Sequence, residues 1–219
     1  MQADYAAGVD LDALLDGAGG AWRRASSEDL KLMGTPVGLQ PTEAIRAAWM
    51  GKAIGAVHAA RVAALHNGEL LAVRLEWEDP SEDGQLGDTT AFPDGAAVLF
   101  PAAPDAPLMT MGAPGAGVNA WYWRADEDGS GRHVVAEGLG TTRTLDRELV
   151  RSRGVWQDGR WRVVIARALR VRTDEAVAQL APGGATGFGV AIWEGGHGER
   201  AGVKAFSGDW RELRLAAGR

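Results

Sequence analysis

Two strand-turn-strand patterns constrain the fold of this 219-residue chain more than any other feature of its sequence. In residues 57–79, Asn67-Gly68 is a favoured type I′ turn pair, and large apolar residues then alternate with smaller or charged ones up to Trp77. In residues 155–171, Asp158-Gly159 is the turn pair, and apolar residues alternate with others in the run that follows it. A two-residue period gives a strand one buried face, so both patterns predict β-hairpins on a hydrophobic core.

Further short apolar runs bounded by Gly, Pro or Asp extend this pattern, and they predict strands at residues 96–100, 118–123, 188–193 and 211–215. Residues 42–56 are rich in alanine and are compatible with a helix, so their assignment stays open. We therefore predict an all-β chain, an antiparallel β-sandwich with long functional loops and a few short helices, forming one domain over residues 1–219.

Glycine-rich segments separate the predicted strands, at residues 80–95, 101–117, 126–146 and 195–209. Long loops in a small domain usually carry function or move. The acidic runs EDPSED (residues 78–83) and DEDG (126–129) are typical of solvated turns rather than of paired catalytic carboxylates. GAPGAG (residues 112–117) lacks the Lys-Ser/Thr ending of a phosphate loop. We therefore expect the loops to carry a functional site that is neither a catalytic carboxylate pair nor a phosphate loop.

Composition excludes several classes of function. The net charge of −6 without a polybasic run argues against nucleic-acid binding. The absence of cysteine excludes disulfides, zinc-cysteine sites, iron–sulfur ligation and covalent haem attachment. No apolar run is long enough for a membrane span, and the acidic N-terminus is unlike a signal peptide. We expect either a cytoplasmic protein or a mature chain whose leader has been removed.

Met111 is the first candidate ligand, because it lies in a Gly/Pro-rich loop just before an aromatic strand. A thioether is a soft, neutral donor that suits haem iron. Met109 is the rival within the same loop, and gap filling in a core is the common alternative role of a methionine.

Lys204 is the second candidate, as one of only three lysines among 23 basic residues. Lysine binds iron only as the neutral amine. At pH 7 the neutral amine must be stabilised by roughly 4 to 5 kcal/mol relative to the protonated form. Arginine does not lose its proton and cannot substitute. A solvated surface charge is the common alternative for a single lysine.

Other residues remain candidates with ordinary structural alternatives. Trp121, Trp123, Trp193 and Phe206 could form the walls of a pocket or belong to the core. Histidines can bind haem, and His58 and His66 could form a metal pair on one predicted strand, although hydrogen-bonded or exposed positions are the simpler interpretation of both. His133 and His197 lie in polar loops, and His197, seven residues before Lys204, could lie near the pocket. No serine has a G-x-S-x-G setting, so we expect no catalysis by this chain itself.

Three segments carry a resemblance to a known family: ALHNGELLAVRLEWEDP (residues 64–80), AVLFP followed later by MGAPGAGVNAWYWRAD (97–101 and 111–126), and AIWEGGHGERAGVKAFSGDWREL (191–213). In this order they resemble the haem b-binding γ subunit of type II molybdoenzymes of the dimethyl sulfoxide reductase family, such as ethylbenzene dehydrogenase, dimethyl sulfide dehydrogenase, selenate reductase and chlorate reductase. The similarity spans about residues 65–215.

The resemblance implies a β-sandwich similar to the cytochrome domain of cellobiose dehydrogenase and to some carbohydrate-binding modules. It also implies one haem b with Met111 and Lys204 as axial ligands and Trp121, Trp193 and Phe206 near it. The subunit would perform no substrate chemistry. It would relay electrons in the periplasm between an iron–sulfur β subunit, beside a molybdenum catalytic α subunit, and a soluble carrier such as a c-type cytochrome.

One rival prediction is a carbohydrate- or small-ligand-binding β-sandwich module without haem. Such a module would present exposed tryptophan faces to sugar rings.

Overall fold

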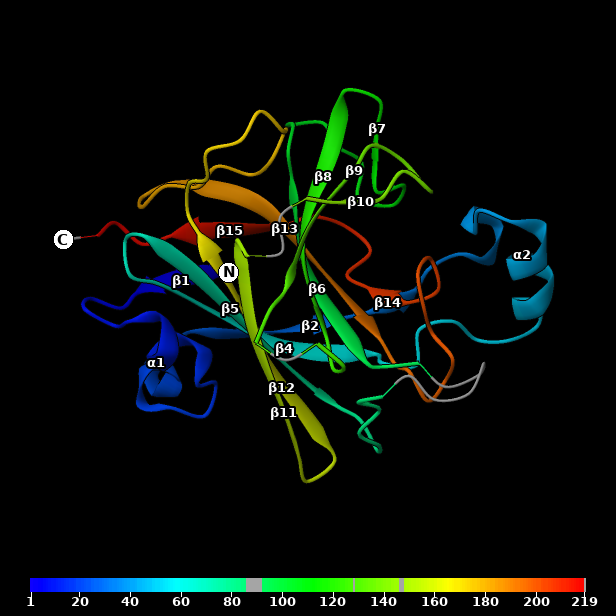
Figure 1. The fold of residues 1–219 in the computed structure, drawn as a ribbon, viewed down its shortest axis with the longest axis horizontal. Helices are drawn as coiled ribbons and strands as arrows, with labels where there is room; N and C mark the ends of the chain where they lie inside the picture. Colours follow the sequence, from blue (N-terminus) through cyan, green and yellow to red (C-terminus); the bar gives the residue numbers. More distant parts are fainter. Residues whose placement is uncertain (86–91, 128, 146–147, 219) are drawn as a thin grey trace.

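Strands far outnumber helices in the computed structural model, which describes residues 1–85, 92–127, 129–145 and 148–218 (Figure 1). The predicted all-β class is confirmed, and every strand predicted above is present. The elements in chain order are β1 (Gln2–Tyr5), α1 (Leu11–Leu15), the 3₁₀ helix η1 (Gly20–Arg24), β2 (Ser27–Lys31), β3 (Met33–Gly34), the 3₁₀ helix η2 (Val37–Leu39), α2 (Glu43–Trp49), β4 (Ala59–His66), β5 (Leu70–Glu78), β6 (Gly95–Pro101), β7 (Gly112–Ala113), β8 (Ala116–Arg124), β9 (Arg132–Ala136), β10 (Arg143–Thr144), β11 (Val150–Gln157), β12 (Arg160–Ala168), β13 (Ala185–Trp193), β14 (Ala205–Phe206) and β15 (Arg211–Leu215).

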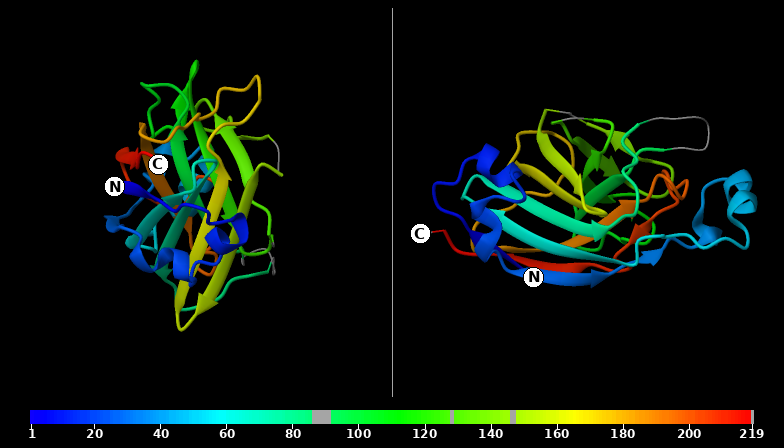
Figure 2. Two further views of the ribbon diagram at one scale, coloured as in Figure 1. Left: turned by 90° about the vertical axis from the view of Figure 1, so that its left-hand side faces the viewer. Right: turned by 90° about the horizontal axis from the view of Figure 1, so that it is seen from below.

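The strands form two layers that share β13 (Figure 2). In the first layer the order is β13-β15-β1-β4-β5-β12-β11, and in the second it is β10-β9-β8-β6-β13, with β14 also beside β13. The first residues of β13 pair with β15 and its last five pair with β6. Pairing is antiparallel except at β1, which the sequence did not predict and which runs parallel to both β4 and β15.

The two predicted hairpins are confirmed, but only one has the predicted turn. Asp158 (φ 53°) and Gly159 (φ 73°) are both left-handed, as a type I′ turn between β11 and β12 requires. Between β4 and β5 only Gly68 is left-handed (φ 99°). There Asn67 Oδ1 accepts hydrogen bonds from the backbone amides of Glu69 (3.0 Å) and Leu70 (2.8 Å). These hydrogen bonds from the Asn67 side chain stabilise the turn without a second left-handed residue, and the connection has three residues instead of two.

The main core lies between the layers and is aromatic at its centre. Trp77, Trp123 and Trp161 are buried together, with ring centroids 4.9–6.3 Å apart. Trp121 packs on Phe100 at 4.6 Å in the same core. Large aromatic rings fill the space between two twisted sheets, which accounts for much of the high tryptophan content.

The two outer sheet faces are covered differently. On the first layer, α1 and η1 cover β4, β5 and β12, and Trp22 Nε1 donates to the Leu14 carbonyl (2.9 Å). On the second layer, a separate buried apolar cluster lies over β6, β8 and β13, and loops instead of helices cover it. This second outer face is the one that carries the candidate site.

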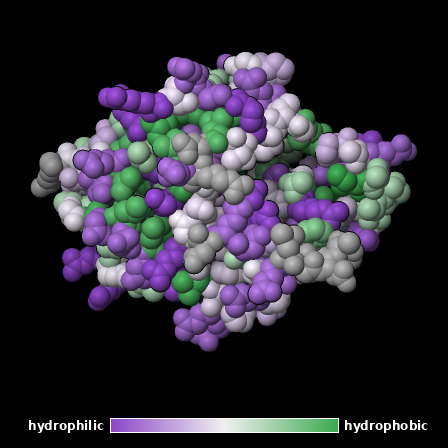
Figure 3. Space-filling view, in the orientation of Figure 1, coloured by the Kyte–Doolittle hydropathy of each residue, from purple (hydrophilic) through white to green (hydrophobic). Residues whose placement is uncertain are grey.

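Residues 42–56, whose assignment the sequence left open, contain α2 followed by an irregular segment. Thr42 caps the helix, since its Oγ1 accepts a hydrogen bond from the Ile45 amide (3.3 Å). The helix projects from one end of the sandwich, where apolar surface is exposed (Figures 1 and 3). Met50, which directly follows the helix, is exposed. Among the described residues, no helix is long and apolar enough to cross a membrane.

Gly154 in β11 provides a test of the packing between the layers. A Cβ atom at this position would lie 2.3 Å from Cζ2 of Trp123. We expect Gly154→Ala to lower the free energy of unfolding by about 1–3 kcal/mol, because an overpacked core must distort. Gly38→Ala, where a Cβ meets nothing within 4 Å, is the matched control. Urea denaturation of both variants measures the effect, and equal stabilities would contradict this packing.

Candidate functional site

A cavity of about 570 Å³ opens on the outer face of the second layer. Its floor is formed by small side chains on three adjacent strands, Ala97 on β6, Ala120 on β8 and Ala191 on β13. Larger apolar residues form the walls, namely Leu99, Leu108, Val134, Trp193 and Phe206. Small residues on a flat floor between apolar walls leave a deep slot, which suits a largely apolar, planar ligand.

Lys204 lies just before β14, and its side chain is one of the lining groups. Only 8% of the residue is exposed, and burial lowers the pKa of its amine to about 8. Among the described residues it has no carboxylate partner, and its Nζ lies 5.4 Å from the centroid of the Trp193 ring. Thr35 fixes the backbone, because its amide donates to the Lys204 carbonyl (3.0 Å). A buried cation without a counter-ion is costly unless it loses its proton or meets a ligand.

Met111 enters the same cavity from the loop between β6 and β7. Its backbone is left-handed (φ 56°), which is rare for a residue with a side chain and costs about 1 kcal/mol or more. Two hydrogen bonds hold it there, from its own amide to the Leu108 carbonyl and from the Gly138 amide to its carbonyl, both at 3.0 Å. Met109 also lines the cavity and is 38% exposed. The strain at Met111 is a sign of function, since it fixes where that side chain points.

The structure brings four of the five predicted site residues together at the cavity: Met111, Lys204, Trp193 and Phe206. Trp121 is not among the lining residues. It lies in the core between the layers, as does Trp123. Both follow from the alternation along β8, where Ala120, Tyr122 and Arg124 face the cavity and the residues between them face inward. We therefore leave Trp121 out of the site.

Polar residues also line the cavity, and no local sequence pattern marks them as site residues. Gln40 is buried at 3% exposure and donates from Nε2 to the Gly202 carbonyl (3.1 Å) and to Thr35 Oγ1 (3.2 Å). Its Oε1 has no hydrogen-bond partner among the described residues. Arg124, Arg132 and Arg200 also line the cavity, whereas no histidine does in the described part of the chain.

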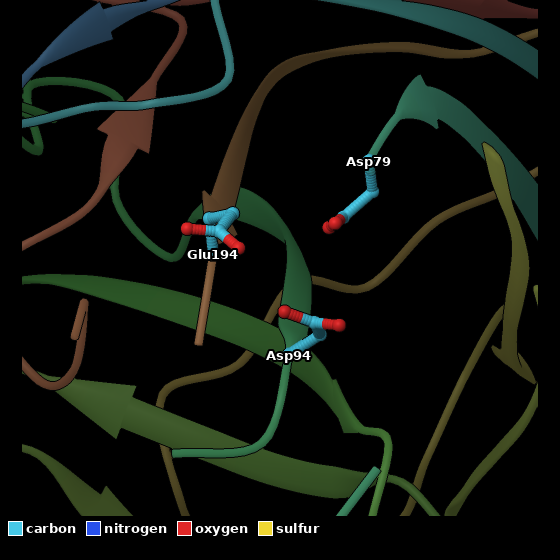
Figure 4. Close-up of side chains that lie close together, drawn as sticks. All are labelled: Asp79, Asp94 and Glu194. Atoms are coloured by element: carbon cyan, nitrogen blue, oxygen red, sulfur yellow. The ribbon is translucent and has the colours of Figure 1, made fainter. Parts of the chain in front are cut away.

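A second polar cluster lies where β5 and β13 end and β6 begins, and it corrects one prediction. Asp79, within the run expected to be a solvated turn, is 1% exposed. It converges with Asp94 and Glu194, and one oxygen of each lies within 4.8 Å of the others (Figure 4). Trp77 Nε1 donates to Asp79 (3.3 Å), and Trp161 Nε1 donates to Asp94 (2.9 Å). The sequence missed this burial because the tryptophan donors come from the folded core.

Burial and mutual repulsion disfavour negative charge in this cluster. Burial raises the pKa of Asp94 to about 7, even though the Gly195 amide donates to it (2.8 Å), and it raises the pKa values of Asp79 and Glu194 as well. Three oxygens at this spacing are also compatible with a hard cation. Among the described residues nothing else points to one, so we assign the cluster no ligand.

We expect the stability of the chain to fall as the pH rises from near 4 to about 7. Asp94 binds a proton more readily in the folded protein than in the unfolded chain, so folding is favoured below this window and the advantage is lost through it. Denaturation at several pH values, with a chelator present, measures the slope.

The cluster variant Glu194→Gln should raise the free energy of unfolding at pH 8 by about 1 kcal/mol and flatten that slope, because it removes one of the facing charges. Glu82→Gln changes an exposed residue of the acidic run that also contains Asp79, and it should leave the free energy of unfolding and the slope unchanged. A slope that Glu194→Gln does not alter would contradict this account.

Comparison with known proteins adds a family. The family model described as ethylbenzene dehydrogenase matches residues 21–148 and 139–205. The chain is 41% identical over 146 residues to chlorate reductase subunit gamma of Ideonella dechloratans, which is 66% of this chain and 60% of that protein. It is 33% identical over 159 residues, 72% of this chain and 56% of the other, to a Haloferax mediterranei protein provisionally named respiratory nitrate reductase heme subunit. The chain thus spans less than two thirds of these curated relatives.

Among solved structures, the chain is similar to a carbohydrate-binding module of family 9 from Caldicellulosiruptor kristjanssonii, with a TM-score of 0.53. The match covers 100% of this chain and 94% of that one at 12% identity. At this identity the likeness shows the β-sandwich fold alone.

Proposed function

Because this chain belongs to the ethylbenzene dehydrogenase family, we propose that it is an electron-transfer subunit that holds one non-covalent haem b in the cavity, with Met111 and Lys204 as axial ligands. The observation that carries the proposal is the pairing of a buried, uncompensated lysine amine with a thioether from a strained loop in one apolar cavity. The relative provisionally named as a heme subunit supports the choice of cofactor.

The residues present fit such a group. When bound, haem supplies one-electron redox chemistry. Lys204 contributes an amine whose lowered pKa, about 8, reduces the free energy needed to remove its proton before it binds a metal. Met111 contributes a soft donor held in place before any ligand arrives. Trp193 and Phe206 exclude water from the slot. The absence of cysteine means that the cofactor is held without covalent attachment to the chain.

The proposal extends to partners and location. The similarity to the protein named chlorate reductase subunit gamma supports the proposal that this chain acts in a complex with catalytic subunits. We propose that this chain carries out no substrate chemistry and passes electrons between an iron–sulfur β subunit, which contacts a molybdenum α subunit, and a soluble carrier such as a c-type cytochrome. The periplasmic location implied by the sequence resemblance belongs to the same proposal.

The rival function, sugar binding without haem, lacks a supporting observation at the surface. That function needs exposed tryptophan faces. In the described part of the chain, every tryptophan is buried or only partly exposed. We therefore favour haem.

Lys204→Arg should abolish the low-spin b-type spectrum of the reconstituted protein and weaken haem binding at least tenfold, because a guanidinium cannot lose its proton to ligate iron. Visible spectra of protein refolded with haem measure both. Lys31→Arg, an exposed change on β2, is the control and should leave the spectrum intact. A low-spin spectrum that persists in Lys204→Arg would refute lysine ligation.

Met111→Leu should lower the midpoint reduction potential of the bound haem, because a thioether favours the ferrous state more than the harder ligands that could replace it. Met109→Leu, in the same loop, should leave the potential nearly unchanged. A spectroelectrochemical titration distinguishes them. The opposite result, with Met109→Leu shifting the potential and Met111→Leu silent, would assign the ligand to Met109.

A further inference from the structure

Three arginines gather at one end of the cavity. Gly95 pairs with Arg124 on one side and with Trp193 on the other, so these two residues mark the same end of the floor, where β6 begins. Arg132 is beside Tyr122 on the neighbouring strand. Arg200 reaches this end from the loop before β14, since its guanidinium carbon lies 4.1 Å from the centroid of the Phe92 ring.

The opposite end of the cavity is apolar. Leu99 and Ala120 pair there across β6 and β8. Leu108 closes that end over β13, where its methyl groups lie within 3.0–3.3 Å of the place that a Cβ atom on Gly189 would occupy. A slot with a cationic end and an apolar end favours a ligand with the same asymmetry, with acids on one edge and hydrocarbon on the other.

The three arginines differ in what they already bind. Arg124 makes two hydrogen bonds to the Asp126 carboxylate, both at 2.8 Å. Arg132 likewise holds the carboxylate of Glu127. Arg200 lines the cavity, is exposed and has no carboxylate partner among the described residues. Guanidinium groups bind carboxylates in a planar, two-point arrangement.

Building on the proposed function, we infer that Arg200 binds a carboxylate of the haem and that the cofactor therefore lies with its acidic edge toward Arg124, Arg132 and Arg200 and its hydrocarbon edge toward Leu99 and Leu108. The guanidinium of Arg200 already makes a cation–π contact with Phe92, which limits the freedom that Arg200 loses on binding.

The test compares haem b with its dimethyl ester, which has the same ring and iron but no ionised acids. Each is loaded into the wild-type chain and into Arg200→Gln, Arg200→Lys and, as control, Arg172→Gln, an exposed arginine that does not line the cavity. Transfer of the cofactor to excess apomyoglobin gives the rate of loss, and circular dichroism checks that each variant is folded.

We expect Arg200→Gln to speed the loss of haem b by roughly three- to tenfold, the range for a partly exposed charged hydrogen bond, and to leave the ester unaffected. Arg200→Lys keeps the charge but not the two-point geometry and should restore part of the retention. Arg172→Gln should match the wild type. Equal effects of Arg200→Gln on both cofactors, or no effect on either, would overturn the inferred orientation while haem binding stands. If the wild-type chain binds neither haem b nor its dimethyl ester, the proposed function is overturned as well.

Discussion

Burial of both faces of the second layer is the constraint on which the site depends. Successive side chains on a strand point to opposite faces, so β8 must serve two environments at once. Trp121 and Trp123 fill the core between the layers, while Ala120 and Tyr122 line the cavity on the other face. The bulky residues keep the sandwich rigid, and the small ones leave room outside it. A cavity on a rigid sheet keeps its shape when the loops around it shift.

Two groups of buried polar side chains near this layer have different consequences. At the cavity, Lys204 is buried without a carboxylate partner and the Oε1 of Gln40 is buried without a hydrogen-bond donor among the described residues, which favours a site completed by a ligand. At the end of β6, the carboxylates of Asp79, Asp94 and Glu194 accept hydrogen bonds from the protein and repel one another, which makes stability sensitive to protonation. The first arrangement bears on function and the second on the pH range of the fold.

Local patterns predicted the hairpins and most strands because hairpin pairing is decided by turn residues and alternation within a few positions. They missed β1, because a strand that pairs in parallel with β4 and β15 has no turn beside it that would mark it. They also missed β2 and β9, and β9 lies within the segment 126–146 that was predicted as a loop. The turn at Asn67 differed from prediction because its side chain bonded the backbone. For the site, Met111 and Lys204 were identified from residue chemistry and family resemblance, and the resemblance is confirmed at the level of the family.

The sequence by itself determined the all-β class, the positions of the two hairpins and of four further strands, the absence of cysteine ligands and the identity of two unusual donor residues. Only the tertiary structure decided that these donors share a cavity, that Trp121 faces the core and that Asp79 is buried. It also placed Gln40 and Arg200 at the cavity, where no local pattern had marked them. The physical reason is that strand register and the loops that meet across the sheet decide which side chains face the cavity and which face the core. Register and loop placement depend on pairings between segments far apart in the chain.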